Sequence, residues 1–275
     1  MSKPNILITG CSSGIGKTSA EILRQKGWWV FASARKLQDV KTLQRAGFDT
    51  LLLDVNDSNS IEQAVTRMLE QTRGKIDALF NNAGFIQPGA VEDLSRNALR
   101  AQFETNLFGA IELTNLILPV MRKQNAGRIV FNSSMLGIVA MKYRGAYNST
   151  KFAMEGLVDT LRLELRNTKI KISLIEPGPI LTKLRANGLE KFKKYIDYDN
   201  SQHKLAYETI LAKLNVKGKA IPFTLESEAV VKKLIHALES PKPKAHYPVT
   251  VPAYMSFWLR RLLPVSLLDK IANKI

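Results

Sequence analysis

The sequence contains one cysteine, Cys11, so no disulfide can form within the chain. A single cysteine is typical of proteins from a reducing compartment. The first residues, MSKPNILITG, show no charged and apolar leader, so we expect no signal peptide. The sequence therefore predicts a cytoplasmic protein.

Histidine is also scarce. The chain has three histidines, and their dispersed positions do not match the spacing of metal ligands: His203, His236 and His246. We interpret them as surface histidines or as histidines satisfied by partners within the protein. The sequence accordingly predicts no metal site.

Acidic residues are outnumbered, because 24 Asp and Glu stand against 40 Lys and Arg, for a net charge of +16. A field of this sign attracts polyanions such as nucleic acid, anionic lipid or a phosphorylated small molecule. The basic residues are scattered, however, and no RNA-binding signature or helix-turn-helix pattern accompanies them. We expect no nucleic-acid partner and interpret most of this charge as solvated surface.

Apolar residues recur in short runs that alternate with helix-periodic segments. The runs are bounded by Gly, Asn or Asp and are typical of parallel strands buried on both faces: NILIT, WWVFAS, FDTLLL, DALFN, GRIVFN and IKISLIE. Helices are predicted over residues 15–26, 60–73, 96–124 and 146–167. The alternation predicts an α/β fold, a single Rossmann-type domain of residues 1–275 with a doubly wound parallel sheet.

The segment after EPGPI departs from this alternation. Residues 183–224 are rich in Lys, Asn and Tyr and match neither the helix period nor the strand period strongly. An insertion of this length is more often a functional lid than a connector, so we predict a substrate lid there. A helix over 226–238 and a strand over 246–251 then resume the fold.

The first predicted strand ends in TGCSSGIG, a strand-to-helix turn with three glycines: Gly10, Gly14 and Gly16. Glycines let the backbone approach a pyrophosphate, and a helix that begins near Ile15 would direct its first N–H groups at the anion. We expect further hydrogen bonds to the phosphates from Ser12 and Ser13. We interpret Cys11 as a small residue of the turn rather than as a nucleophile.

The second predicted strand ends in FASARK, which bears on the choice of cofactor. In an NAD site an acidic residue at this point accepts hydrogen bonds from the adenosine ribose, but Ala34 occupies the position. Arg35 follows, and a guanidinium can bind a 2′-phosphate through two hydrogen bonds, whereas a carboxylate would repel it. We therefore predict NADP(H); the alternative is that Arg35 is a solvated residue opening the next helix.

These motifs resemble those of the short-chain dehydrogenase/reductase family and stand in the family's order over about residues 4–182. TGCSSGIG resembles the family's cofactor turn, and LDV resembles the segment that contacts adenine. NNAG resembles the motif that steadies the central sheet beside the cofactor, and PGPILT the loop that holds the nicotinamide carboxamide. The resemblance implies further cofactor contacts at Asp54, Val55, Asn82, Ala83, Gly84, Pro177, Gly178, Ile180 and Thr182.

The same resemblance implies a catalytic tetrad of Asn106, Ser134, Tyr147 and Lys151. An unperturbed tyrosine, with a pKa of about 10, is poorly matched to acid–base work near neutrality. We expect the Lys151 ammonium, one helical turn away, to lower the pKa of Tyr147 and, by the resemblance, to hold the nicotinamide ribose. Ser134 would polarise the carbonyl, and Asn106 would position a water that relays protons to Lys151.

A finer resemblance concerns the substrate. RGAY, KPKAHYPVT and RRLLP are similar to a bacterial branch of NADP-dependent aldehyde reductases related to retinol and 17β-hydroxysteroid dehydrogenases. This implies an NADPH-dependent reductase of lipophilic aldehydes or ketones, reversible as an alcohol dehydrogenase. The alternatives are a hydroxysteroid dehydrogenase, a reductase of acyl-carrier thioesters, and a protein of another class that binds NADP(H) for sensing or structure, without turnover.

The C-terminal segment, residues 254–275, combines aromatic and apolar residues with Arg260 and Arg261. After Pro264, Ser266 and Asp269 fit a capping box ahead of a short amphipathic helix. The arginines interrupt the apolar stretch, so it cannot span a bilayer. The tail would either dock on its own domain or across a dimer, or rest on anionic membrane or cover the substrate mouth. The family resemblance also implies a homo-oligomer.

Overall fold

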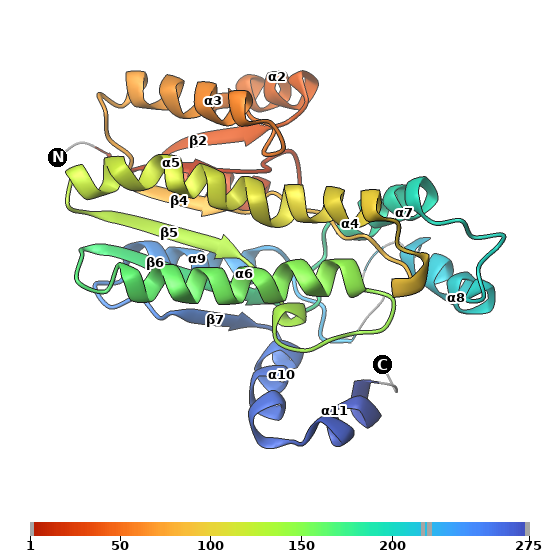
Figure 1. Cartoon of the computed structure of the whole chain (residues 1–275). Coiled ribbons are helices and arrows are strands. Elements are labelled where there is room, and N and C mark those ends of the chain that lie inside the picture. Colours follow the sequence, from red (N-terminus) through yellow and green to blue (C-terminus); the bar gives the residue numbers. More distant parts are fainter. Residues whose placement is uncertain (1–2, 216–217, 219–221, 273–275) are drawn as a thin grey trace.

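A seven-stranded parallel sheet forms the centre of the computed structural model, which describes residues 3–215, 218 and 222–272 (Figure 1). The strand order is β3-β2-β1-β4-β5-β6-β7, and every neighbouring pair is parallel. The bounds are Asn5–Ile8 (β1), Trp29–Ala34 (β2), Asp49–Leu52 (β3), Ala78–Asn81 (β4), Gly127–Asn132 (β5), Ile170–Pro177 (β6) and His246–Val249 (β7). The predicted doubly wound, Rossmann-type α/β fold is confirmed.

Helices cover both faces of the sheet, and each layer is joined to it by one buried apolar cluster. One face carries α3 (Ser58–Gln71), α5 (Gly109–Lys123) and α6 (Gly145–Glu164), of which α5 and α6 cross the front of the sheet in Figure 1. The other face carries α1 (Gly14–Gln25), α2 (Leu37–Arg45) and α9 (Glu228–Glu239).

The strands are apolar on both sides because both faces of the sheet are covered. β1 illustrates this, since all four of its residues are buried. Leu7 packs in the cluster on the α3 side, whereas Ile6 and Ile8 pack in the cluster on the α1 side. Successive side chains of a strand point to opposite faces, so one short run supplies both cores.

The order of the strands reverses at β1, with β2 and β3 on one side and β4 to β7 on the other. In doubly wound sheets ligands bind at the carboxyl ends of the strands, in the crevice at this reversal. The loops after β1, β4, β5 and β6 therefore define where a functional site is expected.

Two helical regions differ from the predicted ranges. The predicted ranges include no helix between β2 and β3, where α2 lies; this helix has nine residues and buries only Val40 and Leu43. The helix predicted over 96–124 consists of α4 (Arg96–Phe103), a π-helical turn, η2 (Glu104–Phe108), and α5. π-Helical turns are rare and occur frequently at functional sites.

The segment predicted as a lid contains two helices, α7 (Leu184–Tyr195) and α8 (Lys204–Asn215), which pack together around Phe192 and Tyr207. Residues 216, 217 and 219–221 of this segment, and 273–275 of the tail, lie outside the described residues. No helix within the described ranges is both long and apolar enough to cross a bilayer.

The tail forms α10 (Val251–Leu262) and α11 (Val265–Ala272), which extend away from the sheet in Figure 1. The predicted capping box is wrong. Ser266 lies inside α11, and the N–H groups of Leu267 and Leu268 donate to the carbonyl oxygen of Pro264. The backbone of Pro264 therefore begins this helix, which leaves the Ser266 side chain no capping role.

Candidate active site

The turn between β1 and α1 packs tightly against the loop after β4. Gly10 has a φ of +74°, and a Cβ atom there would lie 3.0 Å from Cα of Ala83. A Cβ on Gly16 would lie 2.6 Å from Nδ2 of Asn82, closer than atoms can approach. Glycine is therefore required at both positions, and TGCSSGIG lies directly against NNAG.

A cavity of about 390 Å³ lies beside this turn. Its walls come from the turn, the start of α1, the loop after β6 and the start of α9, and they include Ser12, Ser13, Gly14, Lys17 and Thr182. The first N–H groups of a helix have no partner within the helix, and the side chain of Ser13, the N-cap residue, does not bond to those of α1. The cavity, the free helix end and Lys17 together fit the phosphates of a dinucleotide.

Two further residues of the turn face the core. Ile15 packs against the cluster on the α1 side, and Cys11 is fully buried with its thiol 3.2 Å from the carbonyl oxygen of Ile8. Burial raises the pKa of the Cys11 thiol to about 12. A buried thiol that keeps its proton is not a nucleophile, which agrees with the structural interpretation of Cys11.

Asn82 connects the carboxyl ends of β1, β4 and β5 through hydrogen bonds. Its Nδ2 donates to the carbonyl oxygen of Thr9 at 2.9 Å, and its Oδ1 accepts from Nδ2 of Asn132 at 2.9 Å. The Thr9 hydroxyl also accepts from the backbone N–H groups of Asn82 and Ala83, each at 2.9 Å. The loops after β1, β4 and β5 are thus held in one rigid arrangement.

The ends of β2 and β3 lie farther along the same edge of the sheet. Ala34 is buried at the end of β2, and Arg35 is exposed beyond it. After β3, Oδ1 of Asp54 accepts from the N–H of Asn56 at 3.1 Å, and Val55 is buried. Because all these strands are parallel, Arg35 and Asp54 share the carboxyl edge with the glycine turn.

Lys191 on α7 adds a cation whose Nζ lies 4.4 Å from the centre of the Phe85 ring. Burial lowers the pKa of Lys191; the charge of Tyr195 opposes this, and the positive charges of Lys194 and Arg35 add to it. Sequence reasoning missed this residue. The segment EKFKK marks it as basic, but only the fold shows that α7 lies close enough to the end of β2 for the two charges to interact.

Asn106 lies in η2 and is fully buried. Its Oδ1 accepts from the N–H of Phe85 at 3.0 Å, and its Nδ2 donates to the carbonyl oxygen of Phe85 at 2.9 Å. The same Nδ2 lies 3.4 Å from the hydroxyl of Thr150, the neighbour of Lys151. Asn106 therefore fixes the loop after Gly84 against α6, and its water relay to Lys151 stays a prediction.

Ser134, Tyr147 and Lys151 come together where β5 ends and α6 begins. Tyr147 and Lys151 are both buried, and Nζ of Lys151 lies 5.7 Å from the centre of the Tyr147 ring. Lys151 donates to the carbonyl oxygen of Asn132 at 2.7 Å. The Ser134 hydroxyl accepts from the N–H of Leu136 at 3.1 Å, which sets its position in the turn after β5.

Burial dominates the acid–base behaviour of this group. It raises the pKa of Tyr147 to about 12, although a hydrogen bond from Ser134 acts in the opposite direction. Burial also lowers the pKa of Lys151 to about 8, opposed by the negative charge of Glu155. The net pKa of Tyr147 is therefore raised and not lowered in this arrangement, because desolvation is the largest effect on it, and the contribution of the Lys151 ammonium stays a prediction.

The loop after β6 completes the site. The N–H of Gly178 donates to the carbonyl oxygen of Val249 at 3.0 Å, and the carbonyl oxygen of Pro177 lies 3.4 Å from the Ser134 hydroxyl. Ile180 forms an isolated β-bridge with Leu225, in the segment before α9. The Thr182 hydroxyl accepts a hydrogen bond from the backbone N–H of Leu184, the first residue of α7. A Cβ on Gly14 would lie 3.2 Å from the Thr182 side chain, so this loop reaches the glycine turn.

Comparison with known proteins places this geometry in context. The family profile described as short chain dehydrogenase matches residues 4–193. "Uncharacterized oxidoreductase YbbO" of Escherichia coli (strain K12) is 41% identical over 267 residues, which cover 97% of this chain and 93% of that protein. "NADPH-dependent 3-dehydrocapnine reductase" of Ornithobacterium rhinotracheale is 33% identical over 277 residues, which cover 98% and 95% of the two chains.

Solved structures show the same fold. A short chain dehydrogenase/reductase from Burkholderia phymatum, in complex with NAD, superposes with a TM-score of 0.79 at 25% identity. The alignment covers 95% of this chain and 92% of that one. The match extends beyond the family profile, so the similarity in fold includes most of the segment that follows residue 193.

Proposed function

This chain belongs to the short-chain dehydrogenase family of oxidoreductases, and we propose that it is an NADPH-dependent reductase of lipophilic aldehydes or ketones, reversible as an alcohol dehydrogenase. One observation carries the proposal: the side chain of Tyr147 is enclosed by apolar residues and lies beside Lys151 and Ser134. We propose Asn106, Ser134, Tyr147 and Lys151 as the catalytic residues.

The bound nicotinamide cofactor would supply the hydride, and the protein would supply the proton and the electrostatic environment. Tyr147 donates its phenolic proton to the carbonyl oxygen as negative charge develops there, and Ser134 donates a hydrogen bond to the same oxygen. Lys151, one helical turn along α6, stabilises the phenolate that remains. In the oxidative direction the phenolate accepts the proton from the alcohol.

The surroundings of Tyr147 support a lipophilic substrate. Tyr147 forms a small buried cluster with Ile86 and Leu136, and further apolar side chains pack against it: Met135, Val139, Met141 and Leu184. Such an enclosure binds hydrocarbon better than a sugar and excludes water from the reacting oxygen. Leu184 opens α7, which supports residues 183–224 as a substrate lid of the single domain 1–275.

Charge near the end of β2 supports NADP(H) over NAD(H). Arg35 has no acidic neighbour at position 34, and the positive charge of Lys191 lies close enough to interact with it. Two cations there would bind a 2′-phosphate, whereas a ribose hydroxyl needs an acceptor. The name of the 3-dehydrocapnine reductase, which is similar over nearly the whole chain, also specifies NADPH.

The proposal is tested by steady-state rates of the purified protein with aliphatic, aromatic, retinoid and steroid carbonyls, each with NADPH and with NADH. We expect NADPH-dependent reduction of long-chain or retinoid aldehydes. Preferential turnover of steroids or acyl thioesters would favour those alternatives. Tight NADPH binding without turnover of any carbonyl would contradict the proposal and favour a sensing or structural protein.

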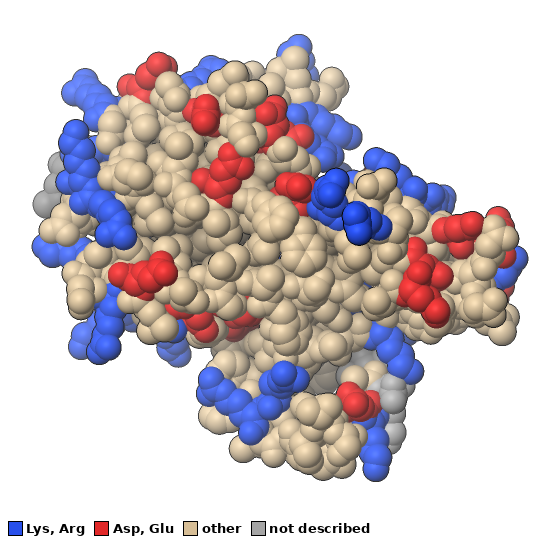
Figure 2. Space-filling view, in the orientation of Figure 1, with Lys and Arg blue, Asp and Glu red and all other residues tan. Residues whose placement is uncertain are grey.

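The face formed by α5 and α6 supports a homo-oligomer. Figure 2 shows a stretch of uncharged surface in the middle of this face, with acidic and basic residues around it. Exposed apolar side chains on η2, α5 and α6 contribute to it: Phe108, Leu116, Phe152, Leu157 and Leu163. Apolar surface of this kind marks an interface, and we propose that a second copy of the chain covers it.

A further inference from the structure

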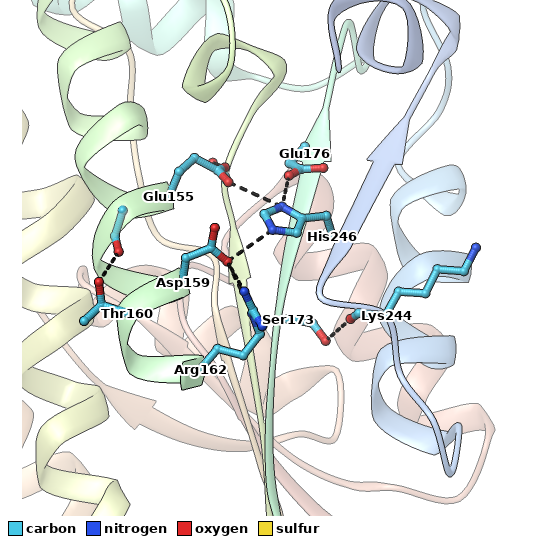
Figure 3. A network of polar contacts seen from close by, with 10 residues as sticks. Glu155, Asp159, Thr160, Arg162, Ser173, Glu176, Lys244 and His246 are labelled. Carbon is cyan, nitrogen blue, oxygen red and sulfur yellow. Dashed lines mark hydrogen bonds and ion pairs between the residues drawn. The ribbon is translucent and has the colours of Figure 1, made fainter. Parts of the chain in front are cut away.

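Two glutamates and a histidine from three separate elements meet beyond the catalytic residues (Figure 3). Glu155 lies on α6, Glu176 lies near the end of β6, and His246 begins β7. One carboxylate oxygen from each glutamate and one imidazole nitrogen all lie within 4.8 Å of one another. Nδ1 of His246 is 2.6 Å from Oε1 of Glu176 and 3.6 Å from Oε2 of Glu155.

Glu176 supplies an independent sign that a ligand is bound here. Its side chain is fully buried, and its Oε2 has no hydrogen-bond partner among the described residues. A buried carboxylate oxygen without a partner loses its hydration without compensation, which is costly. The other oxygen, Oε1, lies 2.6 Å from Nδ1 of His246, so a cation bound by the whole carboxylate would compensate the buried negative charge that Oε2 carries.

We propose that Glu155, Glu176 and His246 bind one divalent transition-metal ion, with Zn²⁺ as the best match. An imidazole nitrogen together with carboxylate oxygens is a donor set that zinc accepts, whereas Mg²⁺ prefers oxygen ligands and retains several waters. Two carboxylates and a neutral imidazole also balance the charge of a dication. The three ligands leave a fourth position for water.

The surrounding contacts orient these donors as a metal site requires. Oδ1 of Asp159 lies 3.2 Å from Nε2 of His246, so this carboxylate can hold a proton on Nε2, and the proton that Nδ1 shares with Oε1 of Glu176 would leave when an ion binds. Arg162 in turn donates to the same Oδ1 at 3.0 Å. The Ser133 hydroxyl donates to Oε1 of Glu155, which leaves Oε2 of Glu155 for coordination.

The proposed metal site would link α6, β6 and β7, which lie next to the catalytic residues. Glu155 lies one helical turn beyond Lys151, Glu176 immediately precedes Pro177, and β7 leads into the tail helix α10. An ion bound there would link α6, β6 and β7, so it should raise the thermal stability of the whole chain. This structural role does not depend on the proposed substrate.

The test uses the full-length protein, stripped with a chelator and dialysed against Zn²⁺ at about pH 8. Bound metal is measured by elemental analysis and stability by calorimetry. We expect one zinc ion per chain and a higher Tm with Zn²⁺, but no change with Mg²⁺. Glu176→Gln and His246→Gln should lose both effects. His203→Gln is the matched control, because His203 pairs with a single glutamate, Glu92.

Asp159→Asn keeps all three ligands and removes only the group that orients His246, so it provides a test that does not require a ligand mutant to fold. We expect one zinc ion still to bind, with affinity reduced about 10- to 100-fold. Absence of zinc binding by the folded wild-type protein would overturn the proposal. Unchanged zinc affinity in both His246→Gln and Asp159→Asn would overturn it equally, whatever the enzyme assays show.

Discussion

Lys151 donates a hydrogen bond of 2.7 Å to the carbonyl oxygen of Asn132, the last residue of β5, while its Nζ stays 5.7 Å from the centre of the Tyr147 ring. The ammonium is thus anchored to the sheet rather than bonded to the phenol. Since burial raises the pKa of Tyr147 to about 12, the tyrosine retains its proton at neutral pH. This arrangement suits a proton donor for carbonyl reduction.

Tyr147→Phe should remove reductase activity and leave NADPH binding nearly intact, because only the proton donor is lost and the ring still packs with Ile86 and Leu136. We expect turnover to fall by about 10²-fold or more. Turnover of an aliphatic aldehyde and fluorescence titration with NADPH measure the two quantities. Tyr143→Phe, which changes a tyrosine in the turn before α6, is the control and should keep wild-type rates.

The rate of reduction should depend on pH through Lys151. Burial lowers the pKa of Lys151 to about 8, so its ammonium is present below that pH and lost above it. Without the ammonium the phenolate of Tyr147 is less stable, and kcat/KM for reduction should fall as the pH rises through about 8. Lys151→Arg keeps a charge at all these pH values and should remove this alkaline decline.

Lys151→Ala should lower turnover and weaken NADPH binding, because the proposed role of Lys151 includes holding the nicotinamide ribose. Turnover of an aliphatic aldehyde and the Kd for NADPH measure these two effects, and the pH profile of kcat/KM measures the alkaline decline. A wild-type profile that stays flat to pH values well above 8, or a Lys151→Arg profile identical to the wild type, would contradict the assignment of the alkaline decline to Lys151.

The cofactor preference should move toward NADH when Ala34→Asp is combined with Arg35→Ser. The new carboxylate at the end of β2 repels a 2′-phosphate and accepts from a 2′-hydroxyl, while the guanidinium is lost. The ratio of kcat/KM with NADPH to that with NADH measures the effect. Lys36→Ser is the control, and an unchanged ratio in the double variant would exclude Arg35 from phosphate binding.

The regular alternation of apolar runs and helical periods was sufficient to predict the sheet, because each buried strand shows its pattern locally. The order of the motifs likewise predicts that the glycine turn, Ser134 and Tyr147 share one edge. Other features depend on pairing between distant segments. Leu174 and His246 are partners in the parallel pairing of β6 with β7, which brings Glu176 to His246 across 70 residues of sequence. No spacing rule for metal ligands reveals such a pair.

Burial explains a second limit of prediction from sequence. The four-residue spacing of Tyr147 and Lys151 indicates that a positive charge lies near the phenol, but it does not indicate how far the two side chains are buried from water. Both side chains prove to be buried, and desolvation then determines the direction of both pKa shifts. The π-helical turn η2 that carries Asn106 is also invisible to an analysis of apolar periodicity, because it is only five residues long and lies between two ordinary helical segments.

The apolar face on α5 and α6 should hold two copies of the chain together. Phe152→Glu, on the exposed side of α6, would place a charge in that interface and should shift the protein toward monomer. Light scattering at micromolar concentration measures the molar mass. Leu205→Glu, which changes an exposed leucine on α8, is the control and should leave the mass unchanged. A monomeric wild-type protein would contradict this prediction.

The final prediction concerns the tail. α10 contacts β7 and the turn that follows Ser134, with Ala253 and Ser256 buried. Its other side presents exposed apolar side chains beside Arg260 and Arg261, and α11 continues this surface: Tyr254, Met255, Trp258, Leu262, Leu267 and Ile271. One side of α10 therefore docks on the protein, and the other side is available to anionic lipid or to a long substrate.

Deletion of residues 254–275 should reduce sedimentation with anionic liposomes and raise KM for long-chain aldehydes, with little effect on short ones. The long substrate loses an apolar contact near Ser134, whereas a short aldehyde never reaches the tail. Arg260→Glu keeps the apolar surface and reverses one charge, so it should weaken liposome binding alone. If the truncated protein stays folded and retains wild-type liposome binding and KM values, the tail serves neither membrane nor substrate, and docking on its own domain or across the dimer would be its whole role.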